Sequence, residues 1–181
     1  MTSMNCDISE ILFSEHRIQD RIRELAQQIT NDYQDRNPVI ISILKGGFIF
    51  MADLIRSITI PVELDFLAIS SYGSGASSSG VVKIKKDIDI DITGRDVIIV
   101  EDIVDSGLSL QYIRDYISKH KPSSIKVCVL LDKPEAHKMT VSFEYVGFNI
   151  GTEFVVGYGL DYNEKYRNLP YIGILKKEIY S

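Results

Sequence analysis

The sequence has few of the features that mark secreted, membrane-embedded or zinc-binding proteins. Its 181 residues include two cysteines, Cys6 and Cys128, which stand far apart, form no CxxC pair and have no histidine cluster beside them. This spacing argues against a zinc site and favours reduced thiols. No apolar stretch approaches the ~18 residues needed to cross a bilayer, and residues 1–17 lack the positive-then-apolar plan of a signal peptide. We therefore expect a cytoplasmic protein with no membrane partner.

An excess of positive charge is also missing. The formal net charge is -5 and the isoelectric point is near 5.2, whereas a protein that binds nucleic acid along a broad surface usually carries a basic patch. We therefore expect no nucleic-acid partner. A small anionic ligand remains compatible with this charge, because backbone amides and a few cations can hold a phosphate locally.

Hydrophobic residues make up 45% of the chain, and their spacing predicts alternating helices and strands. At this length the chain can bury one good core but is too short for two ordinary domains. Apolar residues at steps of three and four predict an amphipathic helix that begins after a cap at Ser14 and runs to about Tyr33. Further helices are expected over 48–58 and 106–120. Apolar or alternating runs predict strands over 39–44, 62–70, 97–100, 124–131, 143–148, 154–158 and 171–175.

This alternation of strands and helices predicts an α/β fold with a mostly parallel central sheet flanked by helices. In such sheets ligands bind outside the carboxyl ends of the strands. The segment 72–80 is rich in glycine and serine, which is typical of a mobile loop.

Two segments imitate known binding loops but fail at required positions. The glycine-rich segment has Ser78 where a dinucleotide-binding loop needs its third glycine, and Val81 where a Walker loop needs its lysine. Residues 86–93 alternate isoleucine with aspartate, yet Ile92 stands where a calcium loop needs glycine. We interpret this second segment as the polar face of a strand or hairpin.

The segment 97–109 carries the most chemical information. A buried strand ends in the adjacent carboxylates Glu101 and Asp102, which offer acceptor oxygens for hydroxyl groups or a hydrated cation. Asp105 then opens a turn with one glycine and two hydroxyl side chains just before a helix, where free amides and the positive end of the helix dipole favour a phosphate. A ligand with a phosphate at one end and vicinal hydroxyls nearby is a ribose 5-phosphate. A lone turn of this kind is usually a simple helix cap, but here all the parts occur together.

This segment resembles the phosphoribosyl pyrophosphate signature of type I phosphoribosyltransferases. From about Ile8 to Leu175 the chain is similar to the hypoxanthine-guanine branch, in bacterial form. Ser109 stands where threonine is more usual, and Leu108 replaces a basic residue of the animal enzymes. The segments that carry the similarity outside the signature are 44–47, 71–72, 131–133, 154–158 and 160–164, together with Arg167.

The resemblance implies the architecture and the roles of individual residues. It implies a single domain over 1–181, with a core over about 38–160 and a small hood built from the N- and C-terminal segments. Glu101 and Asp102 would bind the ribose hydroxyls, and Glu101, Asp102 and Asp161 would hold Mg²⁺. The 5-phosphate would be held by Asp105, Ser106, Gly107, Leu108 and Ser109, the pyrophosphate by Lys45, Gly46, Ser71, Tyr72 and Arg167, and the base by Lys133, Phe154, Val155 and Asp161.

The reaction implied is transfer of the 5-phosphoribosyl group from phosphoribosyl pyrophosphate to N9 of hypoxanthine or guanine. Asp105 would exchange a proton with N7 of the purine. A homodimer or homotetramer is the expected assembly. Two alternatives stay open: a regulator that senses phosphoribosyl pyrophosphate, and a transferase for another base such as xanthine. We also predict that the peptide bond between Lys45 and Gly46 adopts the cis form beside pyrophosphate.

Overall fold

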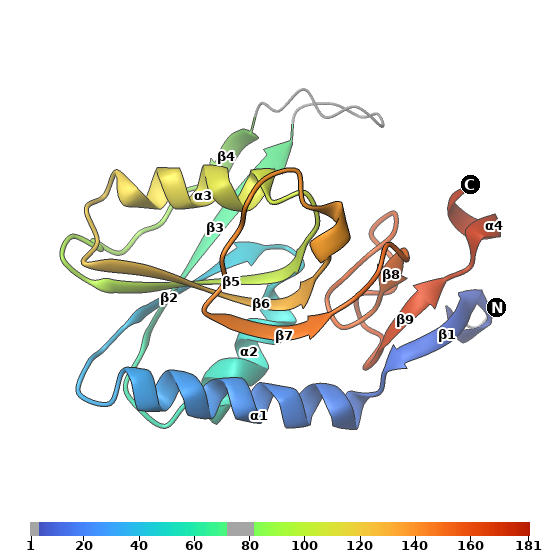
Figure 1. The fold of residues 1–181 in the computed structure, drawn as a ribbon, viewed down its shortest axis with the longest axis horizontal. Coiled ribbons are helices and arrows are strands. Elements are labelled where there is room, and N and C mark those ends of the chain that lie inside the picture. The colour runs from blue at the N-terminus through green and yellow to red at the C-terminus, as the bar shows by residue number, and fades with distance from the viewer. Residues whose placement is uncertain (1–3, 72–81) are drawn as a thin grey trace.

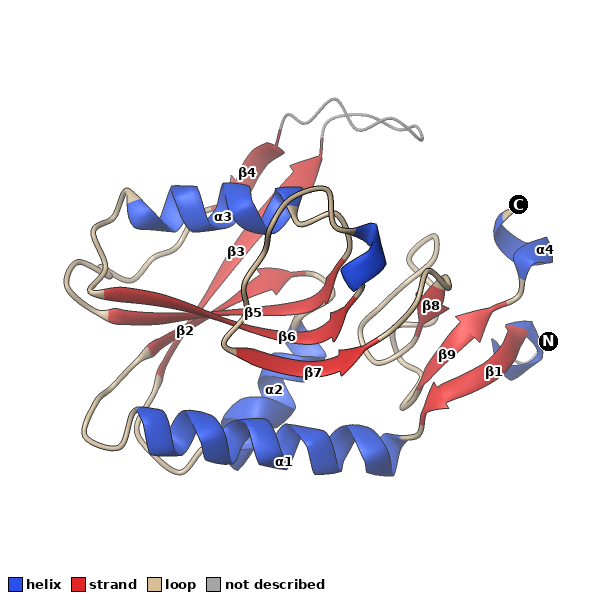
Figure 2. Cartoon of the chain, in the orientation of Figure 1, coloured by secondary structure: helices blue, strands red, loops and turns tan. Residues whose placement is uncertain are grey.

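The computed structural model describes residues 4–71 and 82–181, so the glycine- and serine-rich loop expected over 72–80 lies outside the described residues. Figures 1 and 2 show how the elements are arranged in space. In chain order they are η1 (Met4–Asp7), β1 (Ile8–Phe13), α1 (Glu15–Asp32), β2 (Val39–Leu44), α2 (Phe48–Ser57), β3 (Glu63–Ser71), β4 (Val82–Lys86), β5 (Asp96–Val104), α3 (Leu108–Ser118), β6 (Ser124–Asp132), η2 (Pro134–Ala136), β7 (Tyr145–Asn149), β8 (Val155–Val156), β9 (Ile172–Leu175) and α4 (Lys177–Tyr180).

A six-stranded sheet with the order β4-β3-β2-β5-β6-β7 forms the centre of the molecule. Its strands pair in parallel except for β4, which runs antiparallel to β3. Helix α3 covers one face, and helices α1 and α2 cover the other (Figure 1). The predicted mostly parallel sheet flanked by helices is therefore confirmed.

The apolar side chains of the central strands are divided between the two faces of this sheet. Ile40 and Ile98 pack in the cluster that includes α1 and α2, whereas Ile41 and Ile99 pack in the cluster that includes α3. Successive residues of a strand point to opposite faces, so a strand covered on both sides is apolar at nearly every position; in β2 the exception is the buried Ser42. This explains why the near-continuous β-branched runs mark the most buried strands.

Helix α1 forms as its sequence pattern predicts. Ser14 caps its first turn, because the side-chain Oγ accepts a hydrogen bond from the backbone N–H of Arg17 at 3.4 Å. The predicted apolar stripe faces the sheet, and its buried members include Ile18, Ile22, Leu25 and Ile29. Burial of this stripe, at about 25 cal/mol for each Å² of apolar surface, holds the helix against the core.

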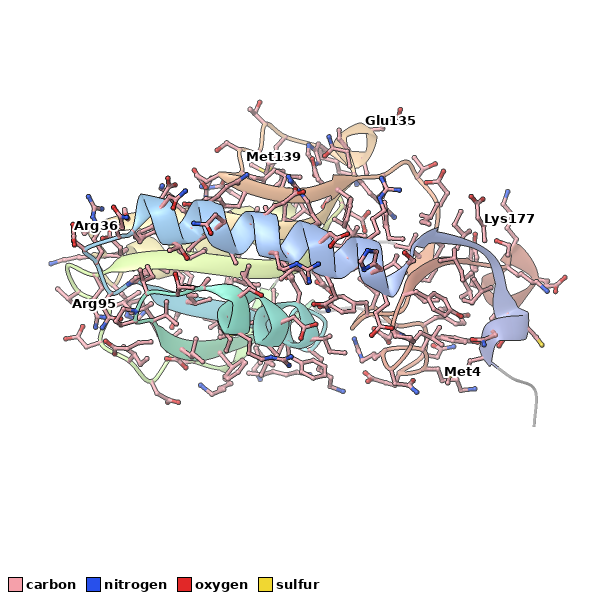
Figure 3. All side chains as sticks on the ribbon, turned by 90° about the horizontal axis from the view of Figure 1, so that it is seen from below. Met4, Arg36, Arg95, Glu135, Met139 and Lys177 are labelled. Carbon is pink, nitrogen blue, oxygen red and sulfur yellow. The ribbon has the colours of Figure 1, made fainter. Side chains whose placement is uncertain are left out.

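A second, antiparallel sheet with the order β1-β9-β8 joins the N- and C-terminal segments. It lies beyond the carboxyl ends of β5, β6 and β7 (Figure 1). Figure 3 shows Met4 and Lys177 at this end of the molecule and Arg36 and Arg95 at the opposite end. The small hood expected from the chain ends is therefore present. Within residues 4–71 and 82–181, no helix is both long and apolar enough to cross a membrane.

The prediction of a strand or hairpin over residues 87–93 is wrong. These residues form irregular backbone after β4, because their amides bond to a buried side chain and not to a neighbouring strand. The backbone N–H groups of Asp89 and Ile90 donate to Asp65 Oδ2 at 2.7 and 2.9 Å, and Asp65 itself is only 5% exposed. The isoleucine alternation serves burial instead, with Ile92 packed in the core on the α3 side.

The strand expected over 154–158 is also shorter than predicted. Strand β8 holds only Val155 and Val156, because Gly157 has a φ of 99° and turns the chain away. The backbone N–H of Gly157 then donates to the carbonyl of Leu160 at 3.1 Å. This tight turn begins the loop 157–169, which faces the carboxyl end of β2.

Candidate functional site

The segment 101–109 runs from the end of β5 to the first turn of α3, as the sequence predicts. It lines a cavity of about 140 Å³ whose walls are Glu101, Ile103, Val104, Asp105, Ser106, Gly107, Ser109 and Leu110. Gly107 caps α3 with a φ of 81°, a left-handed conformation that favours glycine. A Cβ at this position would also approach Val141 Cγ1 to 2.9 Å. The first amides of a helix have no partner within the helix, so this cavity offers donors for an anion.

A second cavity of about 220 Å³ adjoins the first. Its walls are Asp102, Ile103, Asp105, Lys133, Phe154, Val155, Leu160 and Asp161. Every residue predicted to bind the base is among them, and Asp102 and Asp105 come from the segment 101–109. Ile103 and Leu160 were not identified from the sequence, because an apolar residue in an apolar segment has no pattern that marks a binding surface.

Glu101 and Asp102 are held in an enclosed environment. Glu101 is 8% exposed, and burial raises its pKa well above the usual range, with the neighbouring Asp102 adding to the shift. Burial raises the pKa of Asp102 to about 6, although the backbone N–H of Ile103 donates to its carboxylate at 3.0 Å. Both carboxylates are therefore unfavourable as anions until a cation or a donor reaches them.

The residues expected around Mg²⁺ fit the ion only in part. Asp102 and Asp161 line the same cavity, but Asp161 Oδ1 is paired with Arg167 Nη2 at 2.8 Å. In the part of the chain that the structure describes, no three acidic, histidine or cysteine side chains gather closely enough to cage a metal. Mg²⁺ commonly takes one or two carboxylates and completes its shell with water and phosphate oxygens. The enclosed carboxylates of Glu101 and Asp102 suit that mode of binding.

The turn between β2 and α2 approaches the end of β5 so closely that glycine is required. A Cβ on Gly46 would collide with the carboxylate of Asp102, and one on Gly159 would collide with the carbonyl of Gly46. The cis peptide bond lies between Leu44 and Lys45. The prediction therefore placed the cis bond one residue too late, at Lys45–Gly46; it rested on the low steric hindrance of Gly46, whereas the bond that is cis directly follows the last residue of β2.

The two cations predicted to bind pyrophosphate meet at one carboxylate. Lys45 Nζ lies 3.0 Å from Glu164 Oε2, and Arg167 Nη2 lies 3.4 Å from the same oxygen. The hydrogen bond from Lys45 lowers the pKa of Glu164. Arg167 Nη1 donates to the carbonyl of Gly159 at 2.8 Å, and its Nε is buried without a partner among the described residues. Glu164 was not singled out from the sequence, where it is one charge among several.

Lys133 lies in the second cavity and faces Asp105. It is 9% exposed, and its Nζ lies 3.2 Å from Asp105 Oδ1. Its backbone N–H donates to the carbonyl of Val104 at 3.0 Å. The end of β6 therefore places this lysine beside the phosphate turn, although 28 residues (133 − 105) separate the two along the chain.

Phe154 and Val155 come from the small sheet. The ring of Phe154 lines the second cavity, whereas Val155 is buried and pairs with Ile174 of β9. Ser71 is the last residue of β3, and its backbone pairs with Val82. Tyr72, predicted to close over pyrophosphate, lies outside the described residues. The structure thus brings together the predicted residues of β5, β6 and β8, the 45–47 turn and the 157–169 loop.

Comparisons with known proteins agree with this geometry. The sequence model of the phosphoribosyl transferase domain matches residues 9–163. The chain is 52% identical over 175 residues to a hypoxanthine-guanine phosphoribosyltransferase of Streptococcus pyogenes, covering 97% of both chains. It is also 52% identical over 179 residues to the bifunctional protein TilS/HprT of Listeria innocua, where it covers 99% of this chain but spans only 28% of the length of that relative.

Two solved structures share the fold. A hypoxanthine-guanine phosphoribosyltransferase of Bacillus anthracis, with a HEPES molecule in its active site, superimposes with a TM-score of 0.90 and 51% identity, covering 93% of this chain and 99% of that one. A hypoxanthine phosphoribosyltransferase of Staphylococcus aureus gives a TM-score of 0.95 and 47% identity, covering 100% of this chain and 99% of that one.

Proposed function

The chain belongs to the phosphoribosyl transferase family, and we propose that it is a purine salvage enzyme. It transfers the 5-phosphoribosyl group from phosphoribosyl pyrophosphate to N9 of hypoxanthine or guanine, and it releases pyrophosphate with IMP or GMP. One observation carries this proposal. A phosphate-binding turn that follows two enclosed carboxylates adjoins a cavity that contains Lys133 and Phe154. The chain that forms this site is 52% identical, over nearly its whole length, to a hypoxanthine-guanine phosphoribosyltransferase.

The sugar-phosphate end of the substrate binds along 101–109. The amides of the first turn of α3 and the hydroxyls of Ser106 and Ser109 hold the 5-phosphate. Glu101 and Asp102 accept hydrogen bonds from the ribose hydroxyls, and together with Asp161 they would hold Mg²⁺. When bound, the ion neutralises charge on the pyrophosphate and makes it a better leaving group.

The purine occupies the second cavity. Its ring stacks on Phe154, and Lys133 donates a hydrogen bond to O6. Asp105 stands beside N7, where it exchanges a proton and offsets the positive charge that develops as the glycosidic bond forms. The Asp105 side chain is accessible to the incoming base because it is 58% exposed. Its ion pair with Lys133 places the two polar groups side by side in the cavity. Val155 and Asp161 complete the wall of this cavity.

Pyrophosphate leaves between the 45–47 turn and the 157–169 loop. Lys45, Arg167 and the amide of Gly46 bind it, and Ser71 and Tyr72 close over it to exclude water. The buried Nε of Arg167, which has no hydrogen-bond partner within residues 4–71 and 82–181, supports this role, since an oxyanion would satisfy it. Pyrophosphate has to displace Glu164 from Lys45 and Arg167, because both cations contact that carboxylate here.

The proposal also includes the domain organisation, the cellular compartment and the oligomeric state. Residues 1–181 act as one domain in the cytoplasm, and two or four copies assemble. Sedimentation measurements of the purified protein test the assembly, because a monomer at micromolar concentration contradicts it. The alternatives of a phosphoribosyl pyrophosphate-sensing regulator and of a xanthine transferase remain outcomes of the assay that follows.

The decisive experiment is an assay of the purified protein with phosphoribosyl pyrophosphate, Mg²⁺ and separate bases. Nucleotide and pyrophosphate should appear in equal amounts with hypoxanthine or guanine, and far more slowly with xanthine, adenine or uracil. Xanthine as the best base would favour the transferase alternative. Tight binding of phosphoribosyl pyrophosphate without turnover of any base would favour the regulator and reject the proposed enzyme.

A further inference from the structure

The ring of Phe154 separates two cavities. It lines the cavity of about 220 Å³ that contains Lys133 and Asp105. It also lines a cavity of about 400 Å³ beside β9 and α4, where Tyr180 is part of the wall. Tyr180 is not among the described residues that line the cavity of about 220 Å³. One side of the ring therefore faces the proposed base site, and another side faces α4.

Two tyrosines hold this ring from the side of α4. Tyr180 stacks on Phe154 with the ring centroids 4.8 Å apart and an interplanar angle of 25°. Tyr162 meets Phe154 edge-on, at 5.7 Å and 90°. The two tyrosine rings lie 6.4 Å from each other. Offset stacking and edge-to-face contacts are the favoured arrangements of aromatic pairs, so the orientation of Phe154 is restricted.

The backbone connects Tyr180 to the same small sheet that carries Phe154. The backbone N–H of Leu175, the last residue of β9, donates to the carbonyl of Phe154 at 2.9 Å. The next residue, Lys176, donates its N–H to the carbonyl of Asp7 at 2.9 Å. Helix α4 then follows directly and ends at Tyr180. Both the first and the last described segments therefore determine where the Tyr180 ring lies.

Phe154 is only partly enclosed, because it packs against the buried cluster of Val156, Tyr166, Leu169 and Leu175 without being buried itself. It is half-buried and precedes a strand of only two residues. A side chain that is free to change rotamer has to be immobilised when a ligand binds, and this immobilisation weakens the affinity. A ring already held in place avoids that cost.

We infer that Tyr180 is a positioning residue for the purine base. It holds the ring of Phe154 so that the base, Phe154 and Tyr180 stack in succession, although Tyr180 itself does not touch the base. This inference rests on the proposed function, because it concerns the affinity of that site for its base. It predicts an effect on the base alone, since Tyr180 lies away from the sugar-phosphate turn.

The test uses three variants of the full chain. Tyr180→Leu removes the ring but keeps an apolar side chain, and Tyr180→Phe keeps the ring. Tyr171→Leu is the matched control, because Tyr171 is also half-buried, packs in the same cluster as Tyr180 and instead donates its hydroxyl hydrogen bond to Asn5. Steady-state kinetics give KM for hypoxanthine and for phosphoribosyl pyrophosphate separately, and calorimetric titration with GMP gives an affinity that does not depend on turnover.

For Tyr180→Leu we expect KM for hypoxanthine to rise and GMP affinity to fall, each by roughly three- to tenfold, as the strength of an aromatic pair implies. KM for phosphoribosyl pyrophosphate should stay within about twofold, and Tyr180→Phe should restore the wild-type values. An unchanged KM for hypoxanthine, an equal effect of Tyr171→Leu, or equal losses for both substrates would each overturn the inference. A wild-type protein that transfers to no purine would instead reject the proposed function, whatever the variants do.

Discussion

The two ends of the candidate site are built in different ways. The sugar-phosphate end comes from one continuous segment, 101–109, that links β5 to α3. The base end is assembled from separate parts of the chain, with Lys133 directly after β6, Phe154 directly before β8 and Asp161 in the loop that follows β8. Residues that act together at the first end are neighbours in sequence, whereas those at the second end meet only after folding.

This difference teaches where a substitution can act. The continuous segment is shaped by its own backbone, including the positive φ of Gly107, so it tolerates changes elsewhere. The base end depends on contacts between elements, such as the ion pair of Lys133 with Asp105 and the stacking of Tyr180 on Phe154. We expect effects at the first end on chemistry and phosphoribosyl pyrophosphate, and effects at the second end on the base.

Removal of divalent cations should give the largest loss of activity, because it should impair both ends of the site at once. The proposed ion would join Asp102 of the continuous segment to Asp161 of the other end. Activity in excess chelator should fall by roughly 10³-fold or more, because pyrophosphate remains a poor leaving group until its charge is neutralised. Coupled release of pyrophosphate measures the rate, and added Mg²⁺ should restore it. Undiminished turnover in chelator would contradict the assignment.

Asp105→Asn should act mainly on the chemistry of the continuous segment, although it also removes the charge that pairs with Lys133. Turnover is expected to fall by roughly 10²-fold, because the amide cannot exchange the proton with N7 while the turn itself survives. Steady-state kinetics should show kcat reduced and KM for phosphoribosyl pyrophosphate nearly unchanged. Asp115→Asn is the control, since Asp115 lies exposed on α3 and its carboxylate accepts a hydrogen bond from the Gln111 side chain. Wild-type kcat in the Asp105 variant would remove this residue from the mechanism.

Lys133→Gln should act mainly on the base end, although it also removes the charge that pairs with Asp105. We expect KM for hypoxanthine and guanine to rise roughly tenfold, because the base loses a hydrogen bond from a charged donor. KM for phosphoribosyl pyrophosphate should change little. Lys138→Gln provides the comparison, because Lys138 is exposed and only its backbone N–H bonds to Ser106. Equal losses for both substrates would mean that the two ends are not separable at this position.

Asp102→Asn should give the smallest effect, and it concerns stability. Burial raises the pKa of Asp102, so its anion destabilises the folded state at neutral pH when no cation is bound. We expect the melting temperature without metal to rise by roughly 2–4 °C. The variant keeps the oxygen that accepts from Ile103. Asp35→Asn on the exposed surface is the control and should leave the melting temperature unchanged. A melting temperature of Asp102→Asn below that of the wild type would contradict the prediction, because it would show that the Asp102 carboxylate is already stabilised as an anion.

The correct and incorrect sequence predictions differ in how local their causes are. The cap at Ser14 and the stripe of α1 depend on residues three and four apart, and both are confirmed. The strand or hairpin over 87–93 is wrong because Asp65, from another strand, accepts the amides of Asp89 and Ile90. A residue that lies more than twenty positions away leaves no trace in a local pattern. The cis bond was placed one residue too late although the end of β2 was predicted correctly, so the steric freedom of glycine alone did not identify the cis peptide.

Apart from β1, β4 and the short helices, which it did not predict, the sequence by itself determined the order of strands and helices and the segment 101–109, because apolar periodicity and a glycine turn are local properties of the chain. Only the tertiary structure decided which surfaces meet at the base end. It brought Glu164 to Lys45 and Arg167, and it placed Tyr180 against Phe154. The reason is physical: a charge or a ring has many possible partners along a chain, and packing of the two sheets selects among them.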